Sequence, residues 1–203
     1  MSQQDQQKGA TIINLIGGPN TGKTCTALGL SYFMKRAGLR VKYVQEYAED
    51  MVYEDRSNIL ADQLYILAKQ NRRLHRLRHA TDYVITDSPL LLGIVYSKQG
   101  GTQAFRNTVH EYWDSYNNLT FYHPRDKSFA YHQQGRVQDS HEAASVMDGI
   151  IQGNLRGQTV ELTLGFDYIR QIVDYLQLPV NLGSPAQRFD LNALSELRQK
   201  NYY

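Results

Sequence analysis

The chain has 203 residues, enough for one domain with a substantial core but short for two. Its 41% hydrophobic and 21% charged residues exclude an intrinsically disordered protein, and a formal net charge of +2 gives no overall basic field for nucleic acid, although a local basic groove stays open. A single cysteine, Cys25, excludes an internal disulfide, and no apolar run approaches the roughly 18 residues of a membrane span. Because the polar start is not a signal peptide, these features predict a cytoplasmic protein.

The first predicted strand leads directly into a glycine-rich motif. Residues 11–16 form an apolar run, residues 17–24 read GGPNTGKT, and residues 23–37 have the pattern of a helix ended by Gly38. This matches G-x-x-x-x-G-K-[ST], the phosphate-binding loop, in its strand–turn–helix context. Such a turn exposes backbone N–H groups and a helix N-terminus to a polyphosphate. The sequence therefore predicts binding of a nucleoside triphosphate.

Further strands and helices alternate along the rest of the chain. Strands are expected at 40–44, 83–86, 119–122 and 159–164. Helices are expected at 59–78, 90–96, 102–115, 140–155 and 166–176, with a short helix or loop at 51–58, a mobile polar loop at 126–138 and a short helix near 191–200. This alternation predicts a mostly parallel sheet.

The fold class expected from this order is α/β: a three-layer P-loop NTPase or kinase fold with a mostly parallel five-stranded sheet covered on both faces. One domain is expected at 11–178, after a flexible tail at 1–10 and before a C-terminal extension at 179–203 that packs on the domain or trails it. In such sheets the ligand binds at the carboxyl ends of the strands.

Two residues are predicted to hold magnesium. The Thr24 hydroxyl ends the loop motif, and Asp87 follows the third strand, where P-loop proteins place an acid that holds Mg²⁺ directly or through water. A helix cap is the alternative for Asp87. Lys23 is expected to reach the β- and γ-phosphates of ATP. The expected nucleotide-binding residues are Gly17, Gly18, Pro19, Asn20, Thr21, Gly22, Lys23, Thr24 and Cys25.

Glu46 follows the second strand at the same edge of the sheet. A carboxylate there could accept a proton from an attacking hydroxyl, and a solvated loop glutamate is an equal alternative. Tyr47 could stack on a base or pack in the core.

Cationic side chains offer contacts to phosphate. Arg125 after the fourth strand and Arg136 in the polar loop, with Lys127 between them, are expected to close over the transferring phosphate, unless the loop is merely solvated. The helix 59–78 is expected to carry Gln63, Gln70, Arg72, Arg73 and Arg76 on its wetter faces, where arginines could contact an acceptor phosphate and glutamines a base edge.

Several short segments together resemble a known family. They are residues 13–19 (INLIGGP), 45–48 (QEYA), 62–65 (DQLY), 69–71 (KQN) and 83–90 (YVITDSPL). They resemble a P-loop kinase family common in tailed bacteriophages and related to the AAA-type domain that includes bacterial nicotinamide riboside kinases. The resemblance spans about residues 11–176.

This resemblance implies ATP-dependent phosphorylation of a hydroxyl on a nucleoside-type acceptor. Several phage members are similar to kinases that phosphorylate 5-hydroxymethyluracil in phage DNA, a hypermodification that protects the DNA from host nucleases. The catalytic residues would then be Lys23, Asp87, Glu46, Arg125 and Arg136, acting with ATP and Mg²⁺ in the host cytoplasm.

Two other functions stay open. The first is a kinase of a free nucleoside, a nucleoside monophosphate or nicotinamide riboside, which a small closed pocket would favour, whereas an open basic cleft would favour DNA. The second is a nucleotide-driven switch that hydrolyses ATP and moves loops for a partner.

Overall fold

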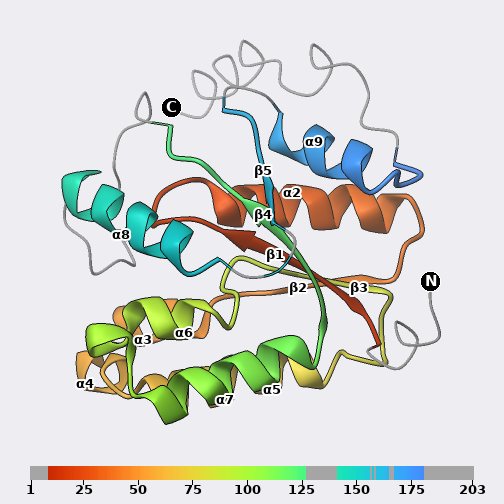
Figure 1. Cartoon of the computed structure of the whole chain (residues 1–203). Coiled ribbons are helices and arrows are strands. Elements are labelled where there is room, and N and C mark those ends of the chain that lie inside the picture. Colours follow the sequence, from red (N-terminus) through yellow and green to blue (C-terminus); the bar gives the residue numbers. More distant parts are fainter. Residues whose placement is uncertain (1–8, 127–140, 156, 158, 165–166, 181–203) are drawn as a thin grey trace, which may run out of the picture.

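The structure is a computed structural model (Figure 1), and it describes residues 9–126, 141–155, 157, 159–164 and 167–180. The expected loop 126–138 and the short helix near 191–200 lie almost entirely outside these residues. The division into a tail, a domain and an extension therefore stays a prediction.

Five parallel strands form a single sheet, as the sequence predicts. They are β1 (Thr11–Ile16), β2 (Val41–Val44), β3 (Tyr83–Thr86), β4 (Asn117–Tyr122) and β5 (Thr159–Glu161). Their order across the sheet is β2-β3-β1-β4-β5, and every neighbouring pair is parallel. β1 lies in the centre, where Thr11 is opposite both Tyr83 and Asn117. The α/β class is confirmed.

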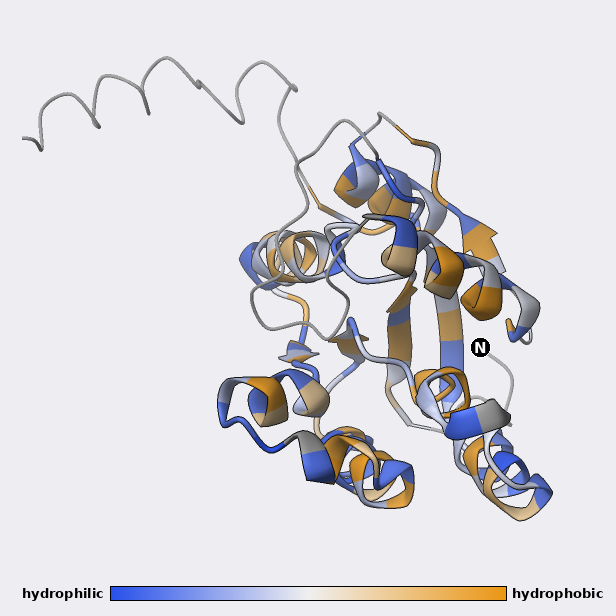
Figure 2. Cartoon of the chain, turned by 90° about the vertical axis from the view of Figure 1, so that its left-hand side faces the viewer, coloured by the Kyte–Doolittle hydropathy of each residue, from blue (hydrophilic) through white to orange (hydrophobic). Residues whose placement is uncertain are grey.

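Helices cover both faces of this sheet (Figure 1). They are α2 (Lys23–Arg36) and α9 (Tyr168–Tyr175) on one face, and α5 (Gln63–His75), α6 (Leu92–Tyr96) and α7 (Gln103–Asp114) on the other. Leu30 and Ile172 pack with Ile13 on the first face, and Leu74 packs with Ile12 on the second. Adjacent residues of β1 pack in the cores on opposite faces of the sheet, which explains why this strand is apolar on both faces. Apolar strand residues lie between the helix layers in Figure 2.

α8 (His141–Gly153) lies at the carboxyl edge of the sheet, beside α6. A third apolar cluster joins the two helices to the ends of β1 and β4, with Ile151 fully buried next to Ile16, Val95 and Tyr122. The position of α8 is thus fixed by apolar packing at the edge where a ligand is expected.

The predicted helix at 59–78 is the main difference. Two helices replace it, α4 (Ser57–Leu60) and α5, because Asp62 caps the second: its carboxylate accepts a hydrogen bond of 3.0 Å from the Tyr65 N–H. A further helix, α3 (Tyr47–Tyr53), and the 3₁₀ turn η1 (Lys98–Gly100) complete the described elements. No helix in the described ranges has the length and apolar character needed to cross a membrane.

Candidate functional site

Parallel strands bring the expected site residues to one edge of the sheet. β1 runs into the phosphate loop at 17–22, β2 ends before Glu46, and β3 ends before Asp87. β4 ends before His123, with Arg125 two residues further on. Segments that are far apart in the sequence thus meet around the start of α2.

The phosphate loop turns sharply into α2. Gly22 precedes the helix with a φ of 89°, in the left-handed region that favours glycine. As a glycine, Gly22 offers no side chain to cap the first turn of α2. Inside the loop, the Gly18 carbonyl accepts hydrogen bonds from the Lys23 Nζ (2.7 Å) and the Thr21 hydroxyl (3.1 Å). Lys23 therefore already lies across the loop, where a phosphate would meet it.

Asp87 is buried directly beside the loop, with 3% of its surface exposed. Its Oδ2 accepts hydrogen bonds from the hydroxyls of Thr24 (2.6 Å) and Tyr43 (2.8 Å). Its Oδ1 is also buried and has no hydrogen-bond partner among the described residues. A carboxylate whose donors are neutral, and which keeps one oxygen unpaired, is suited to a cation.

Tyr43 is a site residue that the sequence analysis missed. It lies on β2, opposite Ile85 of the neighbouring strand. Burial, followed by the charge of Asp87, raises the pKa of Tyr43, so its hydroxyl remains a hydrogen-bond donor at neutral pH. Only the strand order reveals the contact, because nothing in the local pattern of residues 41–44 links Tyr43 to Asp87.

A cavity of about 470 Å³ adjoins the loop. Its charged and hydroxyl-bearing lining residues include Lys23, Thr24, Asp87 and Glu46. Its apolar lining residues come from α3, from α4 to α5, and from the segment between β3 and the end of α6; they are Ala48, Val52, Leu60, Ala61, Ile66, Leu67, Pro89, Leu90, Leu92 and Tyr96. Its size and its mixed lining are typical of a small-molecule site.

The charges on the cavity wall are mostly negative. Among the described lining residues, Lys23 is the only cationic side chain, whereas Glu46, Glu49 and Asp87 are carboxylates. Such a lining disfavours an acceptor that itself carries phosphate groups deep in the cavity.

Most of the expected nucleotide-binding residues line this cavity. They are Gly17, Pro19, Asn20, Gly22, Lys23, Thr24 and Cys25. Gly18 and Thr21 do not, since both are buried and bonded within the structure: the Gly18 N–H contacts Asp148, and the Thr21 hydroxyl contacts the Gly18 carbonyl.

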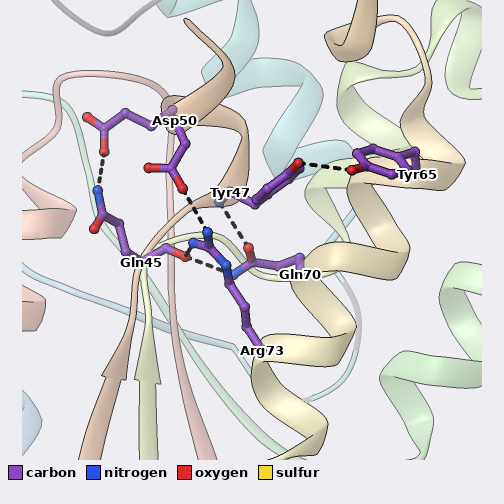
Figure 3. A network of polar contacts seen from close by, with 7 residues as sticks. Gln45, Tyr47, Asp50, Tyr65, Gln70 and Arg73 are labelled. Atoms are coloured by element: carbon purple, nitrogen blue, oxygen red, sulfur yellow. Dashed lines mark hydrogen bonds and ion pairs between the residues drawn. The ribbon is translucent and has the colours of Figure 1, made fainter. Parts of the chain in front are cut away.

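Polar side chains of α5 hold the start of α3 (Figure 3). The Gln70 Oε1 accepts a hydrogen bond from the Tyr47 N–H (3.1 Å), and Arg73 binds both Asp50 (2.7 Å) and the Gln45 carbonyl (3.0 Å). The expected exposure of Gln70 is wrong: only 3% of its surface is exposed, because its amide satisfies backbone groups where β2 meets α3.

Tyr47 packs against other side chains and does not line the cavity. Its hydroxyl donates to Tyr65 (3.3 Å), and the Arg73 guanidinium lies 5.0 Å from the centre of its ring. Glu46 precedes it as the residue before α3 and does line the cavity. Of these two neighbours, Glu46 lines the cavity and Tyr47 does not.

Arg125 reaches the loop but is already paired. Its Nε donates to Asp148 of α8 at 2.6 Å, and 5% of its side chain is exposed. It does not line the cavity. This position of Arg125 differs from the expected contact with a transferring phosphate. The reason is that Asp148 binds and neutralises its guanidinium. Arg136 and Lys127, the other expected cations, lie outside the described residues.

His123 follows β4 and contacts the helix that begins at the phosphate loop. The sequence alone did not indicate a role for it. It is fully buried, its Nε2 lies 3.0 Å from the Thr26 hydroxyl, and its ring packs on Tyr168 with the centroids 4.0 Å apart. Burial, with a smaller contribution from the nearby Lys23, lowers the pKa of His123 to about 4. The imidazole is therefore neutral at physiological pH.

Comparisons with known proteins agree with this geometry. A family model described as an AAA domain matches residues 12–166, more than half of the chain. No curated protein matches the sequence.

Several solved structures share the fold. Thymidylate kinase from Ehrlichia chaffeensis matches with a TM-score of 0.56 and 16% identity, over 83% of this chain and 100% of its own. Deoxyadenosine kinase from M. mycoides, with dCMP and dCDP bound, has a TM-score of 0.52 and 16% identity over 82% and 98% of the two chains. A NadR protein in complex with NR has a TM-score of 0.59 and 16% identity, over 86% of this chain but 53% of its own.

Proposed function

This chain belongs to the AAA-domain family matched above, and on that premise we propose that it is an ATP-dependent kinase that phosphorylates a hydroxyl of a small nucleoside-type acceptor. The observation that carries the proposal is that the phosphate loop, Asp87 and apolar side chains line the same cavity. The thymidylate and deoxyadenosine kinases that share the fold support the same reaction class.

ATP would bind with its phosphates on the loop. The N-terminus of α2 favours the phosphate charge, and Lys23 exchanges the Gly18 carbonyl for a phosphate oxygen. Such a transfer depends mainly on positioning and charge neutralisation.

The residues around Asp87 fit Mg²⁺. The buried Oδ1 has no partner among the described residues, and the Thr24 hydroxyl contacts the other oxygen of the same carboxylate. Oxygen ligands of this kind are the ones that Mg²⁺ prefers. In the proposal Thr24 and Asp87 hold the ion, directly or through water, and Tyr43 orients the carboxylate. When bound, the ion neutralises charge on the β- and γ-phosphates.

Glu46 is the proposed general base. The acceptor oxygen attacks the γ-phosphorus, the new O–P bond forms as the bond from the γ-phosphorus to the bridging oxygen of ADP breaks, and the acceptor proton passes to the Glu46 carboxylate. In support of this role, Glu46, the residue before α3, lines the same cavity as Lys23 and Asp87.

The proposed acceptor is a free, uncharged nucleoside. A cavity of about 470 Å³ with apolar walls can enclose a base and a sugar, and the carboxylates of Glu46 and Glu49 repel an acceptor that brings its own phosphates. This argument favours a nucleoside over a nucleoside monophosphate.

The hydroxymethyl group of 5-hydroxymethyluracil in DNA is the second candidate acceptor. It is favoured by the exposed side of α5, where the Lys69 ammonium lies 5.1 Å from the centre of the ring of Tyr65, an exposed aromatic side chain. Aromatic rings with adjacent cations bind single strands. A flipped base would then enter the same cavity. A role in phage DNA hypermodification belongs to this second candidate.

The deciding experiment offers ATP labelled on the γ-phosphate with separate acceptors: nucleosides, nucleoside monophosphates, nicotinamide riboside, ordinary DNA and DNA containing 5-hydroxymethyluracil. Label on a nucleoside supports the first proposal, and label only on the modified DNA supports the second. Release of label as free phosphate alone, whatever the acceptor, would overturn the kinase and favour the ATPase switch.

Two variants serve as controls in the same assay. Lys23→Ala should abolish transfer because it removes the cation that lies across the loop. Glu46→Gln should lower turnover while the affinity for ATP stays nearly unchanged, because Glu46 acts on the acceptor proton. Equal turnover in Glu46→Gln would leave Glu46 without a role as the base.

A further inference from the structure

We infer that Asp148, held by Arg125, is a positioning residue for the phosphate loop: it fixes the Gly18 peptide and, through it, the place of the Lys23 ammonium. No local motif identifies Asp148, which lies on α8, 130 positions after Gly18. The inference rests on the proposed binding of ATP, because it assigns a role within that site.

The first part of the argument is the pairing of Asp148 with Arg125. The Arg125 Nε donates to Oδ2 at 2.6 Å, and Nη2 donates to Oδ1 at 3.1 Å, which is a two-point contact. Only 5% of the Arg125 side chain and 15% of the Asp148 side chain are exposed. The Arg125 Nη2 also contacts the Ala144 carbonyl of α8 at 3.3 Å. The carboxylate therefore has a fixed orientation.

The second part is the contact with the loop. The Gly18 N–H donates to the Asp148 Oδ1 at 2.9 Å. A Cβ added at Gly18 would lie 2.0 Å from that oxygen and 2.6 Å from the Arg125 Nη2. No side chain fits there while the pair is in place, so the closeness of the ion pair explains the glycine at this position.

The third part is the connection to Lys23. The Gly18 residue that donates to Asp148 also accepts hydrogen bonds at its carbonyl, from the Lys23 Nζ at 2.7 Å and the Thr21 hydroxyl at 3.1 Å. The N–H and the carbonyl of Gly18 belong to the two peptide planes that meet at its Cα, so Asp148 holds the first plane while Lys23 and Thr21 hold the second. The loop is thus held in one arrangement before ATP arrives, which reduces the entropy that binding must offset.

Anchoring α8 does not explain the ion pair. Ile151 of α8 is fully buried beside Ile16, and Met147 packs against the same cluster. A buried ion pair adds little stability over apolar residues of similar size. Only an acceptor such as a carboxylate can take the Gly18 N–H, so the charged pair is better explained by the loop than by the helix.

The test uses the double variant Arg125→Met/Asp148→Leu, which replaces both charged groups by apolar side chains of similar shape and removes the acceptor. We expect its affinity for ATP, measured by calorimetry, to fall about tenfold, which corresponds to about 1.4 kcal/mol, with a melting temperature close to that of the wild type. We also expect a shift of the Gly18 amide resonance, measured without nucleotide, because its hydrogen bond to a carboxylate is lost.

A second double variant, Arg125→Met/Asp148→Asn, restores an acceptor oxygen without a buried charge and should recover most of the affinity. The matched control is Arg40→Met/Asp82→Leu, which removes an exposed ion pair outside the described site and should leave both the affinity and the Gly18 signal unchanged. Unchanged ATP affinity and an unchanged Gly18 resonance in Arg125→Met/Asp148→Leu would overturn the inference. If the wild type does not bind ATP, the proposed function fails, and the Gly18 resonance still tests the contact itself.

Discussion

Two aspartates contact the two ends of the phosphate loop, and their surroundings differ. Asp87 meets the hydroxyl of Thr24 at the end of the loop, has only neutral donors, and keeps one buried oxygen unpaired among the described residues. Asp148 meets the N–H of Gly18 near the start, and Arg125 binds both of its oxygens.

The partners of each carboxylate explain this difference in role. A buried carboxylate without a cation needs one, so Asp87 is suited to hold a metal ion that arrives with ATP. A carboxylate that already has a guanidinium is neutralised, so Asp148 is suited to hold backbone. Proximity to the loop alone does not distinguish chemistry from support.

The largest expected effect separates the two aspartates by activity. Asp87→Asn should lower turnover by about 10³-fold, because several kcal/mol of charge stabilisation depend on the metal site, while the protein stays folded. Steady-state phosphoryl transfer and thermal unfolding measure the two quantities. Turnover within a few-fold of the wild type would remove Asp87 from the metal site.

The next effect separates them by stability. Arg125→Gln leaves the buried Asp148 charge without its cation and should lower the free energy of unfolding by about 3 kcal/mol, measured by urea denaturation. Arg40→Gln is the control, since its pair with Asp82 is exposed, and it should not shift the unfolding midpoint detectably. Similar midpoints for both variants would contradict the assigned difference.

His123, which follows β4 and contacts the Thr26 hydroxyl of α2, gives a pH dependence. Its pKa falls from 6.5 to about 4 on folding, so between these values the unfolded chain binds the proton and the folded chain does not. Stability is complete above pH 6.5 and decreases as the pH falls toward 4, by about 2 to 3 kcal/mol from this residue.

Urea unfolding of the wild type and His123→Gln at several pH values isolates that contribution, because the carboxylates titrate in both proteins. The wild type should lose more stability than the variant between pH 6.5 and 4. Parallel pH profiles would mean that the buried imidazole does not control this change.

The smallest effect concerns the orientation of Asp87. Tyr43→Phe removes one of two hydroxyl donors to Oδ2 and should raise the Mg²⁺ concentration needed for half-maximal binding of an ATP analogue about threefold. Calorimetric titration at a series of Mg²⁺ concentrations measures it. Tyr83→Phe, on the neighbouring strand, is the matched control and should leave the Mg²⁺ requirement unchanged. The same requirement in both variants would show that Thr24 alone orients the carboxylate.

Local sequence patterns were sufficient for the strands and for the loop. The apolar run at 11–16 followed by GGPNTGKT identifies β1 and the phosphate loop, and Asp87 follows from its place after an apolar strand. The cap of α5 could also have been found, because Asp62 stands three residues before Tyr65, in the pattern of a helix start.

Long-range pairings were beyond the reach of those patterns. The partner of Arg125 lies 23 residues away on another element, and Gln70 is buried because it satisfies backbone groups of a junction 23 to 25 residues earlier. Polar residues on a helix predict a face that is exposed to water. Only the assembled structure reveals which of these side chains is instead buried and hydrogen-bonded to the backbone of a neighbouring element.

The central position of β1 also has a consequence for how the chain folds during synthesis. β1 leaves the ribosome before the other four strands of the sheet, and Asn117 of its neighbour β4 is 106 residues behind Thr11. Until then this apolar strand has no partner on either edge. We therefore expect slow folding with a high contact order and a need for chaperones to shield the nascent strand.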